Sequence, residues 1–225
     1  MKTVTFCLLA SLVLSAHAAE IKTNSSLDNT DQVVNQFPVE TALLNIYTKE
    51  SSRTLSAIVY GHKESIEIKV TPKGNLTFEN VLVQGAEQRF TYRYDDEVIE
   101  ESIGINYFTL NPLTFYGFDK PSGKYSLATQ TAVIPKMASI GDSNQFVTER
   151  IYLDSSKNTP VDFYNLTWSL SRASANTAWL CIDIDIYENS SECYQIDGSG
   201  NILQSKKRLQ YWAENSFEII NYMSE

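Results

Sequence analysis

Residues 178–204 read AWLCIDIDIYENSSECYQIDGSGNILQ, and apolar and polar residues alternate along most of this segment. Alternation with period two is typical of a strand that buries one of its two faces. The run Asp197-Gly198-Ser199-Gly200 places glycines where a tight hairpin turn needs positive backbone angles. The segment therefore predicts antiparallel strands joined by short turns.

The same pattern recurs along most of the chain. Pro72-Lys73-Gly74-Asn75 is interpreted as the turn of a further hairpin. The absence of helical segments between the strands argues against a parallel sheet. The predicted fold is all-β and mainly antiparallel, either a β-sandwich or two stacked sheets. The predicted strands cover residues 55–60, 65–70, 90–95, 107–118, 125–134, 146–153, 161–170, 178–187, 193–196 and 201–204.

Two alternatives to this predicted fold are considered, one for the C-terminal end and one for the whole architecture. Leu209, Trp212 and Phe217 match helical spacing, so one short C-terminal helix is the alternative to a last strand. A membrane β-barrel has a similar alternation, but its segments are longer than Ser65–Thr71 and the chain ends on Ser224-Glu225 instead of an aromatic strand.

The first 18 residues resemble a secretory signal peptide. Lys2 precedes the apolar run Phe6–Leu14, and Ala16-His17-Ala18 has the small-x-small pattern of a cleavage site. The leader resembles those of bacterial exported proteins, so we expect a secreted or periplasmic protein without a transmembrane segment. The predicted organisation is a signal peptide (1–18), a flexible extension (19–37) and a β-rich domain (38–225), with two subdomains divided near 119–124 as an alternative.

Two cysteines follow the leader, Cys181 and Cys193, and an oxidising compartment favours a disulfide between them. The predicted strands that carry them flank a short loop. The bond would therefore join neighbouring antiparallel strands.

Composition and motifs exclude several kinds of function. The formal net charge of -9 and the absence of a long basic run argue against nucleic-acid binding. Once the leader is removed, His62 is the one remaining histidine, so a two-histidine zinc site is excluded. No phosphate-binding loop motif occurs. We expect no cofactor.

One short motif bears on catalysis. Gly141-Asp142-Ser143 resembles the nucleophile block of the GDSL hydrolases, a likeness that would make Ser143 the nucleophile. That family completes the block with a histidine near the end of the chain. No histidine follows Ser143 here, so we interpret the segment as a turn.

The segment from Ala178 to Tyr187 also provides the candidate binding residues. One predicted face is apolar, and the other carries Trp179, Asp183, Asp185 and Tyr187 around Cys181. Aromatic rings stack on the apolar faces of sugars, and carboxylates accept hydrogen bonds from hydroxyl groups. These carboxylates could instead supply oxygens to a structural Ca²⁺, or simply keep the face hydrated.

These observations predict an exported, non-enzymatic binding protein for an envelope glycan or a partner protein. Two alternatives are a carbohydrate-active enzyme that uses a pair of carboxylates and a structural or assembly component of the cell surface.

Overall fold

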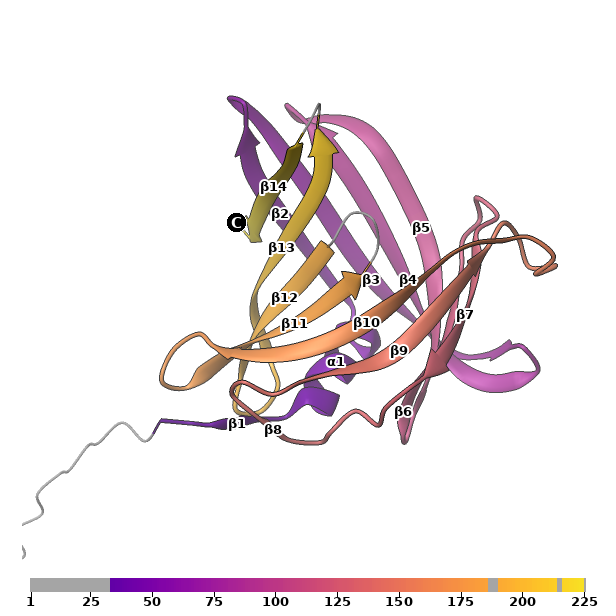
Figure 1. Cartoon of the computed structure of the whole chain (residues 1–225), viewed down its shortest axis with the longest axis horizontal. Coiled ribbons are helices and arrows are strands. Elements are labelled where there is room, and N and C mark those ends of the chain that lie inside the picture. The colour runs from indigo at the N-terminus through magenta and orange to yellow at the C-terminus, as the bar shows by residue number, and fades with distance from the viewer. Residues whose placement is uncertain (1–32, 186–189, 214–215, 225) are drawn as a thin grey trace, which may run out of the picture. The chain divides into compact units, whose positions relative to one another are not determined.

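The structure is a computed structural model that describes residues 33–185, 190–213 and 216–224. Twelve antiparallel strands form a closed barrel (Figure 1). The predicted leader and most of the predicted extension lie outside the described residues. The barrel strands are β2 (Ser51–Val59), β3 (His62–Phe78), β4 (Val81–Tyr94), β5 (Glu97–Leu110), β6 (Leu113–Asp119), β7 (Tyr125–Gln130), β9 (Ser143–Tyr152), β10 (Pro160–Arg172), β11 (Thr177–Asp185), β12 (Ser190–Asp197), β13 (Ile202–Ala213) and β14 (Ser216–Ser224).

Each barrel strand pairs with the strand that follows it along the chain, and β7 pairs with β9. The ring closes where β14 meets β2, through the pairs Met223–Ser56 and Ser224–Leu55. The prediction of a sandwich or of stacked sheets is therefore wrong. The turn between β6 and β7 spans residues 120–124, so strands on both sides of the predicted subdomain boundary belong to one barrel.

The alternation in the sequence determines which side chains face the barrel interior. On β11, Ala178 and Leu180 are fully buried, and Ile182 packs against the same core. Their neighbours on the strand point to the outer surface, because successive side chains of a strand alternate between its two faces. The apolar row predicted from this segment is thus the inner wall of the barrel.

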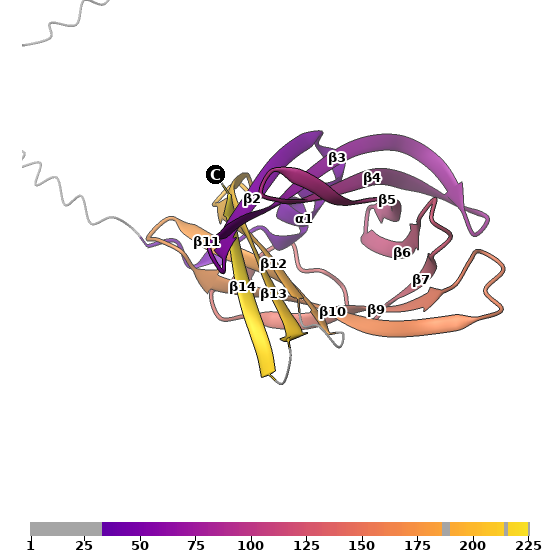
Figure 2. The same ribbon diagram turned by 90° about the horizontal axis from the view of Figure 1, so that it is seen from above.

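A short helix, α1 (Val39–Thr48), lies inside the ring of strands (Figure 2). Its buried residues are Val39, Ala42, Leu43 and Ile46, which lie on one face at helical spacing. The Asn45 side-chain amide donates a hydrogen bond of 2.9 Å to the Gly200 carbonyl in the β12–β13 turn. A side chain at position 200 would lie 3.2 Å from the backbone of Ala42, so glycine lets this turn approach the helix closely.

Just before α1, the chain forms β1 (Gln36–Phe37), which pairs with β8 (Ala138–Ser139). Glu40 in the first turn of α1 donates its backbone N–H to the Pro135 carbonyl at 3.1 Å. The helix is therefore held at its start by the segment that precedes β9, and at Asn45 by the β12–β13 turn.

One local prediction is wrong. Pro72–Asn75 is not a hairpin turn, because β3 continues through it with an irregular register between Pro72 and Gly74 and ends at Phe78. Proline is tolerated within a strand at such a bulge. Of the two alternatives left open for the C-terminal region, the described residues have strands. They form β13 and β14, which pair with each other.

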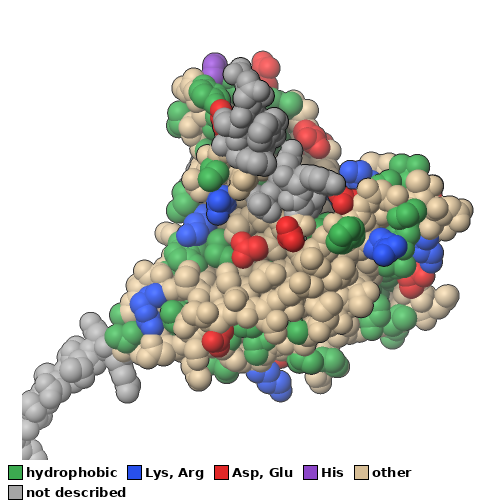
Figure 3. Space-filling view, in the orientation of Figure 1, with side chains coloured by type: hydrophobic (Ala, Val, Ile, Leu, Met, Phe, Trp, Pro, Cys, Tyr) green, Lys and Arg blue, Asp and Glu red, His purple; other side chains and the backbone are tan. Residues whose placement is uncertain are grey.

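On the face seen in Figure 3, hydrophobic side chains are scattered among polar ones. The exposed hydrophobic residues include Phe163 and Val161 on β10 and Ile58 on β2. The described helix is too short to cross a bilayer.

Candidate functional site

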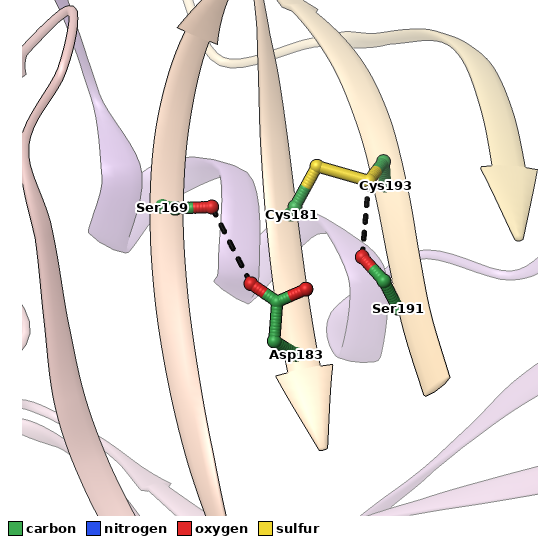
Figure 4. Close-up of a disulfide and its surroundings, with 5 residues drawn as sticks. All are labelled: Ser169, Cys181, Asp183, Ser191 and Cys193. Atoms are coloured by element: carbon green, nitrogen blue, oxygen red, sulfur yellow. Dashed lines mark hydrogen bonds between the residues drawn. A yellow bond between two sulfur atoms is a disulfide. The ribbon is translucent and has the colours of Figure 1, made fainter. Parts of the chain in front are cut away.

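The candidate residues predicted from the sequence lie on the outer face of β11. Trp179 is opposite Gln195 on β12, and Asp183 is opposite Ser191. Ser169 on β10 donates a hydrogen bond to Asp183 at 3.5 Å (Figure 4). Tyr187 lies outside the described residues.

The predicted disulfide is confirmed. Cys181 and Cys193 occupy directly opposite positions on β11 and β12, and their sulfur atoms are bonded. The Ser191 hydroxyl lies 3.4 Å from the Cys193 sulfur on the same outer face. The bond therefore joins neighbouring strands outside the barrel, where it leaves the interior free.

The outer face contains a depression of about 250 Å³ beside this disulfide. Asp183 and Asp185 both line it, and Trp179 does not. The ammonium of Lys206 lies 4.1 Å from the centre of the Trp179 ring, so a cation already covers one face of the indole. The depression is lined by Thr167, Asp183, Ile184, Asp185, Ser190, Ser191, Arg208 and Gln210.

The other residues considered from the sequence belong to ordinary structural features. His62 begins β3, where its Nδ1 lies 2.6 Å from Asp95 and its ring stacks on Tyr94. Ser143 begins β9 directly after the turn that contains Gly141 and Asp142. Among the described residues, no three or more His, Cys, Asp or Glu are grouped so that they could hold a metal ion.

A second cavity, also of about 250 Å³, lies inside the barrel. Its wall is largely apolar, with a small number of polar and charged side chains among the aromatic and aliphatic ones. Its lining residues are Leu43, Ile46, Tyr47, Gln88, Phe90, Ser102, Gly104, Asn106, Phe115, Phe118, Lys120, Phe146, Glu149, Tyr164, Leu166, Ile182, Ile184, Glu192, Tyr194 and Lys207.

Strand register explains why these side chains meet. On β4 and β5, Phe90 is opposite Ser102 and Gln88 is opposite Gly104, so their inward faces form one patch of wall. The absence of a side chain at Gly104 leaves room next to the neighbouring Lys120 stem, which lies 3.3 Å from the place that a Cβ would occupy.

A bulge near the end of β6 directs Lys120 into the cavity. Phe115 lines the cavity, and in a regular strand Gly117 and Asp119 would follow it on the same face. Gly117 instead has a φ of +131°, with an irregular register opposite Tyr107 and Phe108. Phe118 and Lys120 therefore face the interior, which is a common effect of a β-bulge.

One cluster of charged residues in the wall connects distant strands. The Arg53 guanidinium on β2 forms an ion pair with Glu192 on β12 and donates a hydrogen bond of 2.8 Å to the Tyr194 hydroxyl. Tyr194 donates to the same carboxylate at 2.6 Å, and the Lys207 ammonium lies 4.0 Å from it. Burial alone would raise the pKa of Glu192, but the nearby charges of Arg53 and Lys207 lower it to about 2.

A second polar cluster surrounds Glu149 on β9. The Ser126 and Tyr164 hydroxyls both donate hydrogen bonds to its carboxylate, Tyr164 at 2.6 Å. Ser126 in turn accepts a bond of 2.7 Å from the Phe118 backbone N–H beside the bulge. Burial raises the pKa of Glu149 despite these donors.

Comparison with known proteins finds no matching family model, no matching curated protein and no matching solved structure.

The charged residues of the barrel interior were not predicted from the sequence, although the alternation around Cys193 indicates the direction of two polar side chains. If Cys193 faces outward, its neighbours Glu192 and Tyr194 must face inward. No comparable signal exists for Lys120, because its inward direction depends on the bulge at Gly117.

Proposed function

We propose that this protein is an exported, non-enzymatic binding protein that holds a small amphipathic molecule inside its barrel. The observation that carries the proposal is the interior cavity, which combines an apolar wall with a few convergent polar groups. Small-molecule sites generally have this composition, and they occur in the mouths of β-barrels. Export is supported by the leader sequence and by the Cys181–Cys193 disulfide.

The cavity is accessible and of useful size. Ile182, Ile184 and Lys207 in its wall are partly exposed to solvent. A cavity of about 150 Å³ can hold benzene. By proportion, a cavity of about 250 Å³ accommodates roughly ten non-hydrogen atoms, which is an eight-carbon chain with a polar head.

The expected affinity follows from the burial of the chain. Burial of each CH₂ group contributes about 0.8 kcal/mol, so eight carbons contribute about 6 kcal/mol. This energy corresponds to a Kd on the order of 10⁻⁵ to 10⁻⁴ M. Isothermal titration calorimetry with 1-octanol, octanoate and octylamine therefore tests the proposal, and at least one of the three should bind in this range.

Two neighbouring substitutions provide the control. Ile184→Trp fills the cavity from the inner face of β11, whereas Asp185→Trp adds the same side chain to the exposed outer face. Binding should be lost in the first variant and retained in the second. If none of the three probes binds to the wild type, or if both variants bind equally, the proposal is wrong.

A second candidate function is sugar binding at the outer depression, favoured by the fact that Asp183 and Asp185 line it together with Arg208. Asp183→Asn should then abolish the signal on a glycan array, and Trp179→Ala should have a smaller effect because Trp179 does not line the depression. Absence of any signal from the wild type would contradict this candidate.

A further inference from the structure

The Lys120 ammonium is the charged group of the cavity whose position is best suited to a ligand. Its backbone is fixed in the β6–β7 turn, where its N–H donates to the Lys124 carbonyl and its carbonyl accepts from Gly123, both at 2.8 Å. The bulge at Gly117 directs the side chain inward. A cation is therefore held at the cavity wall by an ordered turn.

Lys120 has few compensating contacts. Its ammonium lies 3.4 Å from the Ser102 hydroxyl and 5.5 Å from the centre of the Phe118 ring. Among the ion pairs of the described residues, none involves Lys120. An ammonium has three donors, and a partly desolvated cation without a counter-charge at contact distance is costly. The carboxylates of Glu149 and Glu100 act on the Lys120 charge, but only from beyond ion-pair distance. Burial accordingly lowers the pKa of Lys120.

The carboxylates of the cavity are already engaged. Glu149 accepts hydrogen bonds from Ser126 and Tyr164, and Glu192 is paired with Arg53 and Tyr194. Both carboxylates therefore already have hydrogen-bond donors, and Glu192 also has a cationic partner. Lys120 is the charged group whose interactions remain incomplete.

The charges of the lining are unevenly matched. Lys120, Lys207, Glu149 and Glu192 line the cavity, and Glu192 faces both Lys207 and the adjoining Arg53. The charge of Lys120 interacts with Glu149 and Glu100 only beyond ion-pair distance. Electrostatic complementarity at Lys120 therefore favours an anionic head group over a neutral or cationic one.

We propose that the cavity selects a medium-chain carboxylate, whose head group binds Lys120 and whose chain lies against the apolar wall. This inference depends on the proposed function, because it names the chemical class of the ligand for the same cavity. The carboxylate accepts hydrogen bonds from the donors of Lys120 and supplies a counter-charge at contact distance. Phe118 and Leu166 belong to the apolar wall that receives the chain.

The experiment compares three probes that share an eight-carbon chain: octanoate, 1-octanol and octylamine. Titration calorimetry of the full chain at pH 7 should show octanoate binding at least about tenfold more tightly than 1-octanol, since a hydrogen bond to a charged group is worth about 1.5 to 3 kcal/mol. Octylamine should bind most weakly.

Variants of Lys120 assign this preference to one side chain. Lys120→Met should reduce octanoate binding to the level of 1-octanol binding to the same variant, whereas Lys120→Arg should retain the preference. Lys124→Met is the matched control, because Lys124 is an exposed lysine in the same turn, and it should behave as the wild type.

The outcomes separate the two proposals. If 1-octanol or octylamine binds as tightly as octanoate, or if Lys120→Met keeps the preference, the carboxylate inference is wrong and the binding function stands. If no probe binds the wild type, the binding function itself is wrong. The wild-type comparison decides the inference even if a variant does not fold.

Discussion

The ion pair between Arg53 and Glu192 should make a measurable contribution to stability. It connects β2 with β12 across the barrel interior, near the point where β14 and β2 close the ring through two pairs of described residues. The side chains are 13% and 20% exposed, so the pair is largely shielded from water. Removal of one partner of such a pair leaves the other as a buried, uncompensated charge.

The contribution of this ion pair to the free energy of unfolding follows from the pKa of Glu192. Its fall from 4.5 to about 2 corresponds to about 3 kcal/mol of stabilisation at neutral pH, since each pKa unit is worth about 1.36 kcal/mol. We expect Glu192→Gln and Arg53→Met each to lower the free energy of unfolding by about 3 kcal/mol. The double variant should lose less than the sum, because the second substitution removes a partner that is already lost.

The assay is urea unfolding followed by tryptophan fluorescence, with the disulfide intact. A lowered pKa in the folded state stabilises the protein above the unfolded pKa, so the difference between wild type and Glu192→Gln should shrink as the pH falls from 4.5 towards 2. Lys73→Met is a control, since its more exposed pair with Glu87 should contribute less than about 1 kcal/mol. The reasoning would be refuted if Arg53→Met changed the free energy of unfolding by less than about 0.5 kcal/mol. It would also be refuted if the loss in the double variant equalled the sum of the two single losses.

Three further predictions concern other parts of the barrel. Replacement of Cys181 and Cys193 by serine should lower the free energy of unfolding by about 3 kcal/mol in the chain-entropy model of a loop this short, measured by urea unfolding; an unchanged midpoint would contradict it. Gly117→Ala should destabilise the barrel, because its Cβ would lie 2.2 Å from the Ser126 carbonyl oxygen at a positive φ; a melting temperature equal to that of the wild type would disprove this. In the wild type, the raised pKa of Glu149 should make the free energy of unfolding fall as the pH rises above 4.5 through the folded pKa, and Glu149→Gln should remove this fall; a slope that persists in the variant would assign it to another group.

Some local features of the barrel could be predicted from the sequence. The alternation of Leu180 and Ile182 with Cys181 correctly separated the inner from the outer face of β11, and the spacing of the cysteines correctly predicted their pairing. Both features depend on residues that are close together in the chain. Period-two alternation is the same in a sandwich and in a barrel, however. It therefore carries no information about whether the sheet closes on itself.

The features that were missed depend on contacts between distant residues. Closure pairs Leu55 with Ser224, and no local pattern marks these two as partners. The ion pair between Arg53 on β2 and Glu192 on β12 was not predicted, because the two residues are remote in the sequence. The binding face proposed at Trp179 from residue types stays a prediction, and the contact of Lys206 on β13 with one face of its ring had no local signal in the sequence.

The joint between β14 and β2 also affects how the barrel can fold. It pairs Leu55 with Ser224, which is 169 positions later, and β14 is the last of the barrel strands to leave the ribosome. Until then, β2 has an unpaired edge, and unpaired strand edges are templates for association with other chains. Contacts this distant in sequence also form slowly. Ring closure is therefore a step that follows synthesis of the strands, and the open sheet that precedes it is the species most prone to aggregation.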